Sequence, residues 1–106
     1  MNKVFKALAD PTRRRVLQLL RQRPMTAGEL SERFAVSKPT MSAHFSVLRE
    51  AGLIDAHKSG TTITYRLRLS VLEDAILGFS QVFGIGSGGA EAEEPAAPDL
   101  GKGTPS

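Results

Sequence analysis

The stretch SKPTMSAHFSVLRE, residues 37–50, combines an apolar seam with a row of short polar side chains and one cation. Met41, Phe45 and Leu48 recur at the period of an α-helix and predict a buried face. Hydroxyls and an ammonium group on the exposed side are suited to hydrogen bonding with base edges and phosphates of duplex DNA. We therefore interpret the segment as a helix that reads the major groove through Lys38, Thr40, Ser42 and Ser46.

Other residues of this helix are also candidates for DNA contact, but some of them have a second explanation. At about 100° per residue, Pro39 and Ala43 fall on the exposed side, where Ala43 is suited to contact a thymine methyl group. Ser37 precedes the helix, and N-capping alone explains it. His44 flanks the exposed side and is interpreted as DNA-facing or as a half-buried structural residue. The alternative for the whole row is an ordinary solvated helix with its capping residues.

Two further segments are candidates for contact with the DNA backbone. Thr26 opens the preceding helix, where free backbone N–H groups attract phosphate, although a capping role explains it equally well. A turn between two alternating strands is the second segment, and a solvated turn is its alternative reading. Its candidate residues are Lys58, Ser59, Thr61 and Thr62.

The surrounding elements are predicted from stop and start signals. Asp10-Pro11 starts a second helix after a short first one, Thr26 and Glu29 form a capping box, and Gly52 ends the fourth helix. The hydrophobic period then changes from 3.6 to 2, which indicates a hairpin that turns at Ser59-Gly60. Ser70 caps a last helix over about 71–83. The predicted fold is mainly α, of the α+β class, in the order α-α-α-α-β-β-α: a winged helix-turn-helix.

The first and last helices carry more apolar surface than one small chain is expected to cover. We expect them to form a homodimer interface, and the alternative is packing within one chain. The residues predicted at this interface are Val4, Phe5, Leu8, Leu72, Ala75, Ile76, Phe79, Val82 and Phe83.

Charge and composition divide the chain. Residues 1–90 hold 13 Lys/Arg and 7 Asp/Glu, a net charge of +6, whereas residues 91–106 carry a net charge of −3. We predict a DNA-binding and dimerisation domain at 1–84 and a disordered Gly/Ala/Pro-rich acidic tail at 85–106, which is solubilising or competes with DNA. Without a long apolar run or a signal-peptide pattern, the chain is expected to be cytoplasmic.

Three motifs resemble the ArsR/SmtB family of bacterial winged-helix repressors, especially its SdpR-like autorepressor subgroup. They are FKALADPTRRRVLQLL, MTAGELSERFAVSKPTMSAHFSVLREAGLI and GTTITYRL, which together span about residues 2–80. The resemblance implies a homodimer, joined through its first and last helices, that binds an inverted repeat in a promoter and blocks transcription. Many relatives carry a polar residue at the position of Ala43, so one base contact of the family is missing or replaced here.

The resemblance also implies metal sensing in some members, through thiols at the start of the third helix or through His and carboxylates on the last one. This sequence has no cysteine, carries Thr26 and Gly28 at the first place, and has no histidine on the last helix. We therefore predict no metal site and no cofactor. His44 and His57 lack a partner ligand at productive spacing.

Two functions other than that of a DNA-binding repressor are alternatives for this sequence. A winged-helix module that docks another protein is one alternative, although protein hot spots favour Trp, Tyr and Arg over small polar residues. A ligand-gated sensor-repressor is another. The sequence argues against an enzyme, because no nucleophile, base and orienting group occur together and no glycine-rich phosphate loop precedes a helix.

Overall fold

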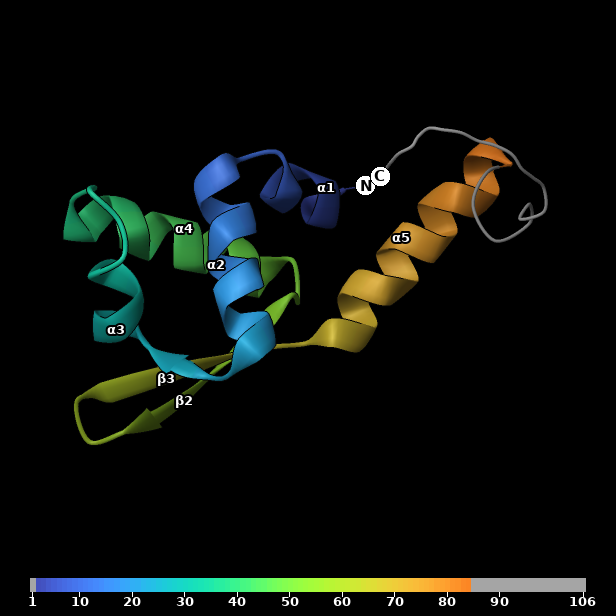
Figure 1. Cartoon of the computed structure of the whole chain (residues 1–106). Helices are drawn as coiled ribbons and strands as arrows, with labels where there is room; N and C mark the ends of the chain where they lie inside the picture. The colour runs from blue at the N-terminus through green and yellow to red at the C-terminus, as the bar shows by residue number, and fades with distance from the viewer. Residues whose placement is uncertain (1, 85–106) are drawn as a thin grey trace. The chain divides into compact units, whose positions relative to one another are not determined.

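The computed structural model describes residues 2–84, and the tail predicted at 85–106 lies outside the described residues. A first compact unit ends at Leu72, so most of the last helix belongs to a second unit. The elements in chain order are α1 (Lys3–Leu8), α2 (Pro11–Gln22), β1 (Met25–Thr26), α3 (Ala27–Ser31), α4 (Lys38–Glu50), β2 (Ile54–Ser59), β3 (Thr62–Leu67) and α5 (Leu69–Phe83) (Figure 1).

Local capping determines where most of these helices begin and end. The Asp10 carboxylate accepts a hydrogen bond from the Arg13 N–H, and the Thr26 and Glu29 capping box is complete. At the end of α4 the N–H of Gly52, whose φ is +76°, donates to the carbonyl of Arg49, and that of Leu53 donates to Leu48. This pair of bonds is a Schellman motif, and it confirms the predicted helix stop at Gly52.

The sheet differs from the predicted hairpin by one strand. Met25 and Thr26 form β1, which pairs with Tyr65 and Thr64 of β3, so the sheet has three antiparallel strands in the order β1-β3-β2. The predicted order without this strand was therefore incomplete. A two-residue strand has no alternating pattern to detect, because its pairing partner lies far along the chain.

Smaller differences concern boundaries. Ser59 pairs with Thr62, so the hairpin turns at Gly60-Thr61 and not at the predicted Ser59-Gly60. Gly60 has φ +61°, the left-handed conformation that a two-residue hairpin loop requires. The last helix begins at Leu69, before the predicted cap at Ser70, and α3 ends at Ser31, where turns follow.

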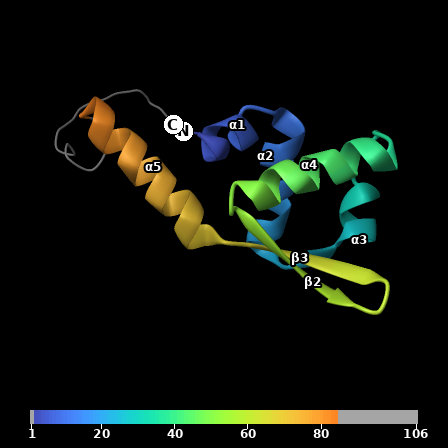
Figure 2. The same ribbon diagram turned by 180° about the vertical axis from the view of Figure 1, so that it is seen from behind.

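The core of the first unit lies where the helices meet the sheet, and α2 packs against α1, α4 and β3. Figures 1 and 2 show the β2–β3 hairpin along one side of this unit, with its loop on the α3 side. Each large aliphatic residue removed from water contributes roughly 1.5–3 kcal/mol to folding. The buried residues are Ala7, Val16, Leu17, Leu19, Leu20, Met25, Leu30, Met41, Phe45, Leu48, Leu53, Ile54 and Tyr65.

The predicted interface residues differ in their surroundings. Val4, Leu8 and Leu72 are half-buried against the core of their own chain. Further along α5, Ile76, Val82 and Phe83 have 52%, 78% and 63% of their surface exposed. None of the described residues 2–84 forms a helix both long and apolar enough to span a bilayer.

Candidate nucleic-acid interface

The first turn of α4 is built by Ser37, whose hydroxyl has two hydrogen bonds. It accepts from the Thr40 N–H at 3.3 Å and donates to the Thr40 hydroxyl oxygen at 2.9 Å. Capping thus accounts for Ser37, as predicted, and the Thr40 hydroxyl keeps its own proton to donate elsewhere. Pro39 sits in the first turn of the helix, where a missing N–H costs nothing.

One side of α4 is buried and the other is exposed, as the sequence predicts. Met41, Phe45 and Leu48 are at most 4% exposed. The polar row on the other side is open to solvent along the whole helix. Its members Lys38, Thr40, Ser42 and Ser46 are all exposed, and so are Pro39 and Ala43 beside them.

His44, which flanks the polar row, is less exposed than the residues of that row. Its side chain is 14% exposed, and its Nδ1 lies 3.1 Å from the Nη1 atom of Arg13 while its Nε2 lies 3.9 Å from the Asp10 carboxylate. The ring therefore faces the start of α2. This geometry corresponds to the half-buried structural reading, and contact between His44 and DNA stays a prediction.

The β2–β3 hairpin, called the wing below, presents an exposed tip. Lys58, Ser59, Thr61 and Thr62 are all exposed around Gly60. The tip follows directly from the strand pairing, in which Lys58 faces Ile63 and Ser59 faces Thr62. The wing thus carries one cation and several hydroxyls where its backbone turns.

Two hollows bring the predicted residues together. One of about 500 Å³ has Lys38 and Ser42 of α4 in its wall, together with Ile63 of β3. The other, of about 250 Å³, joins Thr26 to Thr61 and Thr62 at the wing tip. Ala27, Gly28 and Ile63 line both. The start of α3, the start of α4 and the wing therefore form one continuous surface. The other predicted contact residues lie outside the two hollows: Ser37, Pro39, Thr40, Ala43, His44, Ser46, Lys58 and Ser59.

Thr26 has a defined role within this surface. Its hydroxyl accepts from the Glu29 N–H at 3.0 Å, and its own N–H donates to the Glu29 carboxylate at 2.9 Å. The bond from Thr26 holds the pKa of Glu29 below its ordinary value, against desolvation and with help from Arg23. The capping reading of Thr26 is thus sufficient, and its backbone also anchors β1 beside the wing.

Two arginines, Arg13 and Arg49, were not predicted from the sequence as part of this site. Arg49 is exposed, and it lies on the helical face of Ser42 and Ser46, at a spacing of seven and three residues. That spacing was visible in the sequence and identifies a cation near the end of the exposed row. Arg13, which was not among the predicted site residues, hydrogen-bonds residues of α1 and α4. No sequence signal distinguishes it from its neighbours Arg14 and Arg15.

The aromatic pair beneath the surface joins α4 to the wing. The ring centroids of Phe45 and Tyr65 lie 4.6 Å apart with an interplanar angle of 34°. Burial raises the pKa of the Tyr65 phenol, while the charge of Arg49 acts in the opposite direction. A buried contact of this kind holds the helix and the strand in a fixed relation.

Comparison with known proteins places this geometry in a family. A family model described as a helix-turn-helix domain matches residues 8–57. The transcriptional repressor SdpR of Bacillus subtilis is 49% identical over 76 residues, covering 72% of this chain and 84% of that protein. The HTH-type transcriptional regulator KmtR of Mycobacterium tuberculosis is 45% identical over 64 residues, covering 60% of this chain and 49% of that regulator.

Solved structures agree with the sequence matches. An ArsR-like transcriptional regulator from Rhodococcus sp. RHA1 superposes with a TM-score of 0.68 at 29% identity, covering 77% of each chain. The same fold therefore occurs in a solved transcriptional regulator. The chain belongs to the ArsR/SmtB family of winged helix-turn-helix transcriptional repressors, which bind DNA.

Proposed function

We propose that this chain is a homodimeric repressor that binds an inverted repeat in a promoter. The observation that carries the proposal is the exposed polar row of α4, next to the wing and opposite the buried seam of Met41, Phe45 and Leu48. In this arrangement α4 enters the major groove and the wing lies on the backbone or in the minor groove. The proposed contacts come from Lys38, Thr40, Ser42, Ala43, Ser46 and Arg49 on α4 and from Lys58, Ser59, Thr61 and Thr62 on the wing.

The proposed dimer follows from the apolar side of α5. Ile76, Val82 and Phe83 are large apolar residues with about half or more of their surface exposed, and a second copy would remove them from water. A twofold axis through this interface presents two α4 helices to half-sites about 34 Å apart, one turn of B-DNA. An inverted repeat has the matching symmetry.

We propose that the repressor acts without a bound metal. The sequence contains no cysteine, and residues 2–84 contain no group of three or more His, Asp or Glu side chains placed to hold an ion. Asp10 and His44 approach one another, but Arg13 occupies the Nδ1 side of the ring. These residues do not fit a structural or sensory zinc site, which needs about four ligands.

Fluorescence anisotropy tests the proposal. The purified protein is first used to select duplexes from a random library, and binding to the selected duplex is then compared with binding to a scrambled one at two salt concentrations. We expect selective binding to an inverted repeat that weakens steeply with salt, because phosphate contacts release counterions. Equal binding to both duplexes, or selection of a site without twofold symmetry, would contradict the proposal.

A further inference from the structure

One arginine side chain connects three helices. In the first turn of α2, the Nε atom of Arg13 donates to the carbonyl of Ala7 at 2.9 Å, and Nη2 donates to the carbonyl of Lys6 at 3.0 Å. Nη1 lies 3.1 Å from Nδ1 of His44 in α4. The backbone of Arg13 is itself held by the Asp10 cap at 3.1 Å. The planar guanidinium thus bridges the end of α1 and the middle of α4, and the backbone that carries it is held in place by the cap.

The contact with His44 has a defined direction. Arg13 carries only donors, so Nδ1 of His44 accepts and the ring proton resides on Nε2. Nε2 faces the Asp10 carboxylate at 3.9 Å, which favours the same tautomer. With 14% of its side chain exposed, His44 has little freedom to turn away. The link between Arg13 and α4 is therefore oriented on both sides of the ring.

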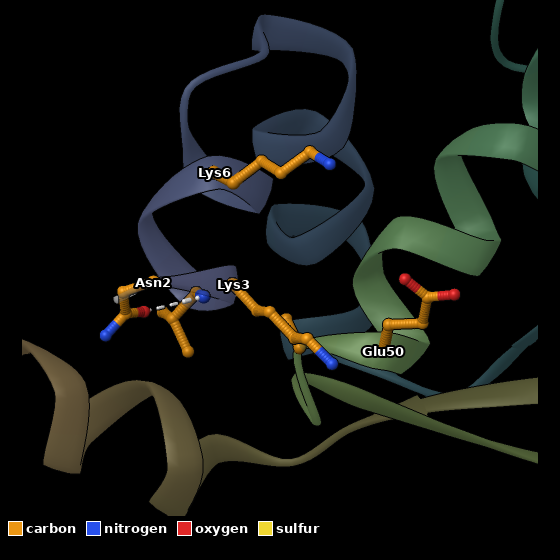
Figure 3. A pocket seen from close by; sticks show the side chains of 6 residues that line it. Asn2, Lys3, Lys6 and Glu50 are labelled. Carbon is orange, nitrogen blue, oxygen red and sulfur yellow. Dashed lines mark hydrogen bonds between the residues drawn. The ribbon is translucent and has the colours of Figure 1, made fainter.

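The other polar groups between α1 and α4 do not provide such a link. A hollow of about 640 Å³ separates the start of α1 from the end of α4. Figure 3 shows Lys3 and Lys6 on α1 and Glu50 on α4 around it, with the Asn2 side chain bonded to backbone within its own helix. No ion pair within 4.0 Å joins either lysine to Glu50 among residues 2–84. Within residues 2–84, Arg13 therefore provides a hydrogen-bonded connection between these two helices that the lysines and Glu50 do not.

We propose that Arg13 is a positioning residue that fixes the recognition helix α4 relative to α1. The inference rests on the proposed function, in which α4 enters the groove, and on the sequence-based prediction that the first helix, α1, contributes to the dimer interface. Because each α4 is then held to the interface by an oriented set of hydrogen bonds, the separation of the two recognition helices is fixed. Arg13 contacts no DNA in this arrangement, and it determines which spacing between half-sites the dimer accepts.

Arg14 provides a matched control. Its Nη1 atom donates to the carbonyl of Leu8 at 2.8 Å, so it also binds the end of α1, but its side chain is exposed and bonds no residue of α4 in the described part of the chain. Arg13→Gln and Arg14→Gln remove the same charge from the same helix. Any difference between them in DNA binding therefore reports the connection to α4 and not the general field.

The test uses an inverted-repeat duplex selected by the wild-type protein from a random library, and versions with the spacer lengthened or shortened by one base pair. For Arg13→Gln we expect binding to the selected duplex to weaken about ten-fold, as for the loss of one or two net hydrogen bonds. We also expect the ratio of the affinity for the original spacer to the affinity for the altered spacers to fall toward one. Arg14→Gln should keep both the affinity within about two-fold and the spacer preference.

His44→Leu tests the same link from α4 and does not depend on the stability of Arg13→Gln. We expect it to reproduce the loss of spacer preference, and the double variant to bind no more weakly than the weaker single variant. If the fold-loss of affinity in the double variant equals the product of the two single losses, His44 contacts DNA independently, and the inference is overturned. Equal behaviour of Arg13→Gln and Arg14→Gln would also overturn it. If the wild-type protein selects no duplex, the proposed function fails first and the positioning role fails with it.

Discussion

The rings of Phe45 in α4 and Tyr65 in β3 are in tilted contact, with their centroids 4.6 Å apart, inside the core that lies beneath the proposed DNA-binding surface. Phe45 is 4% exposed and Tyr65 is 5% exposed. One ring belongs to the recognition helix and the other to the wing. Groove contacts by α4 and backbone contacts by the wing therefore depend on the same packing, because neither element can shift without separating the rings.

Truncating Phe45 should be far more costly than removing the Tyr65 hydroxyl. We expect Phe45→Ala to lower the free energy of unfolding by about 3–5 kcal/mol, since it removes a buried ring and leaves a cavity. Tyr65→Phe keeps the ring contact, so its cost should stay below about 1 kcal/mol. Urea denaturation followed by circular dichroism measures both. Similar losses in the two variants would show that the ring contact is not what stabilises this junction.

The caps and the helix and strand periods could be predicted because they depend on residues within a few positions of one another. Asp10, Ser37 and Gly52 act on their own helices, and the buried seam of α4 follows from its period. The pairing of β1 with β3 could not be predicted in this way. Met25 and Thr26 are too short a segment to show alternation, and their partners come after two further helices and another strand.

The parts of the site that depend on local sequence could likewise be predicted, and the parts that depend on long-range contacts could not. Exposure of the polar row and of the wing tip follows from local patterns. The partner of His44 does not, because Arg13 is 31 residues away and lies in a run of three arginines with identical local signals. Of the three arginines, Arg13 is the one that contacts His44, because α2 packs against α4 at this point. Contacts of this kind depend on the tertiary fold and are invisible to periodicity.

Lys38 should contribute to binding through its charge at the start of α4. We expect Lys38→Ala to weaken binding to the selected duplex about ten-fold and to reduce the slope of log affinity against log salt by about one, as for one lost phosphate contact. Lys3→Ala is the matched control, because it removes the same charge from α1, beside the opposite end of α4 (Figure 3). Anisotropy titrations over several salt concentrations distinguish the two, and equal losses would count against Lys38 as a specific contact.

Asp10 should make stability depend on pH in the acid range. Desolvation by burial raises the pKa of Asp10, but the hydrogen bonds from the backbone N–H groups of Arg13 and Thr12 and the charge of Arg13 lower it by more, so the net shift is downward. Because the pKa of this carboxyl group is lower in the folded protein than in the unfolded chain, the unfolded chain binds the proton more tightly. Its stabilising contribution is therefore complete near pH 7 and is lost as the pH falls below about 4.

Asp10→Asn isolates this effect, because asparagine also caps helices but does not ionise. Urea denaturation of both proteins at pH 7 and pH 3 measures the difference. We expect the wild-type protein to lose more free energy of unfolding than Asp10→Asn between these two values. Asp10→Ala, which removes the cap, should cost about 1 kcal/mol at pH 7. An identical pH dependence of wild type and Asp10→Asn would rule out the carboxylate as the titrating cap.

Ile76 should be required for dimerisation, since 52% of its surface is exposed in the single chain and it lies in the apolar stripe of α5. Ile76→Glu places a charge in the proposed interface and should raise the dimer dissociation constant about 100-fold. Gln81→Glu adds the same charge on the opposite, polar side of this helix and should leave the dimer intact.

Sedimentation velocity distinguishes the two variants. In the micromolar range, Ile76→Glu should sediment as a single 11.4 kDa chain, while the wild-type protein and Gln81→Glu sediment as species of twice that mass. Because a monomer reads one half-site, Ile76→Glu should also lose its preference for an inverted repeat over an isolated half-site. A monomeric wild-type protein that still prefers the repeat would mean that DNA, and not α5, brings the two copies together.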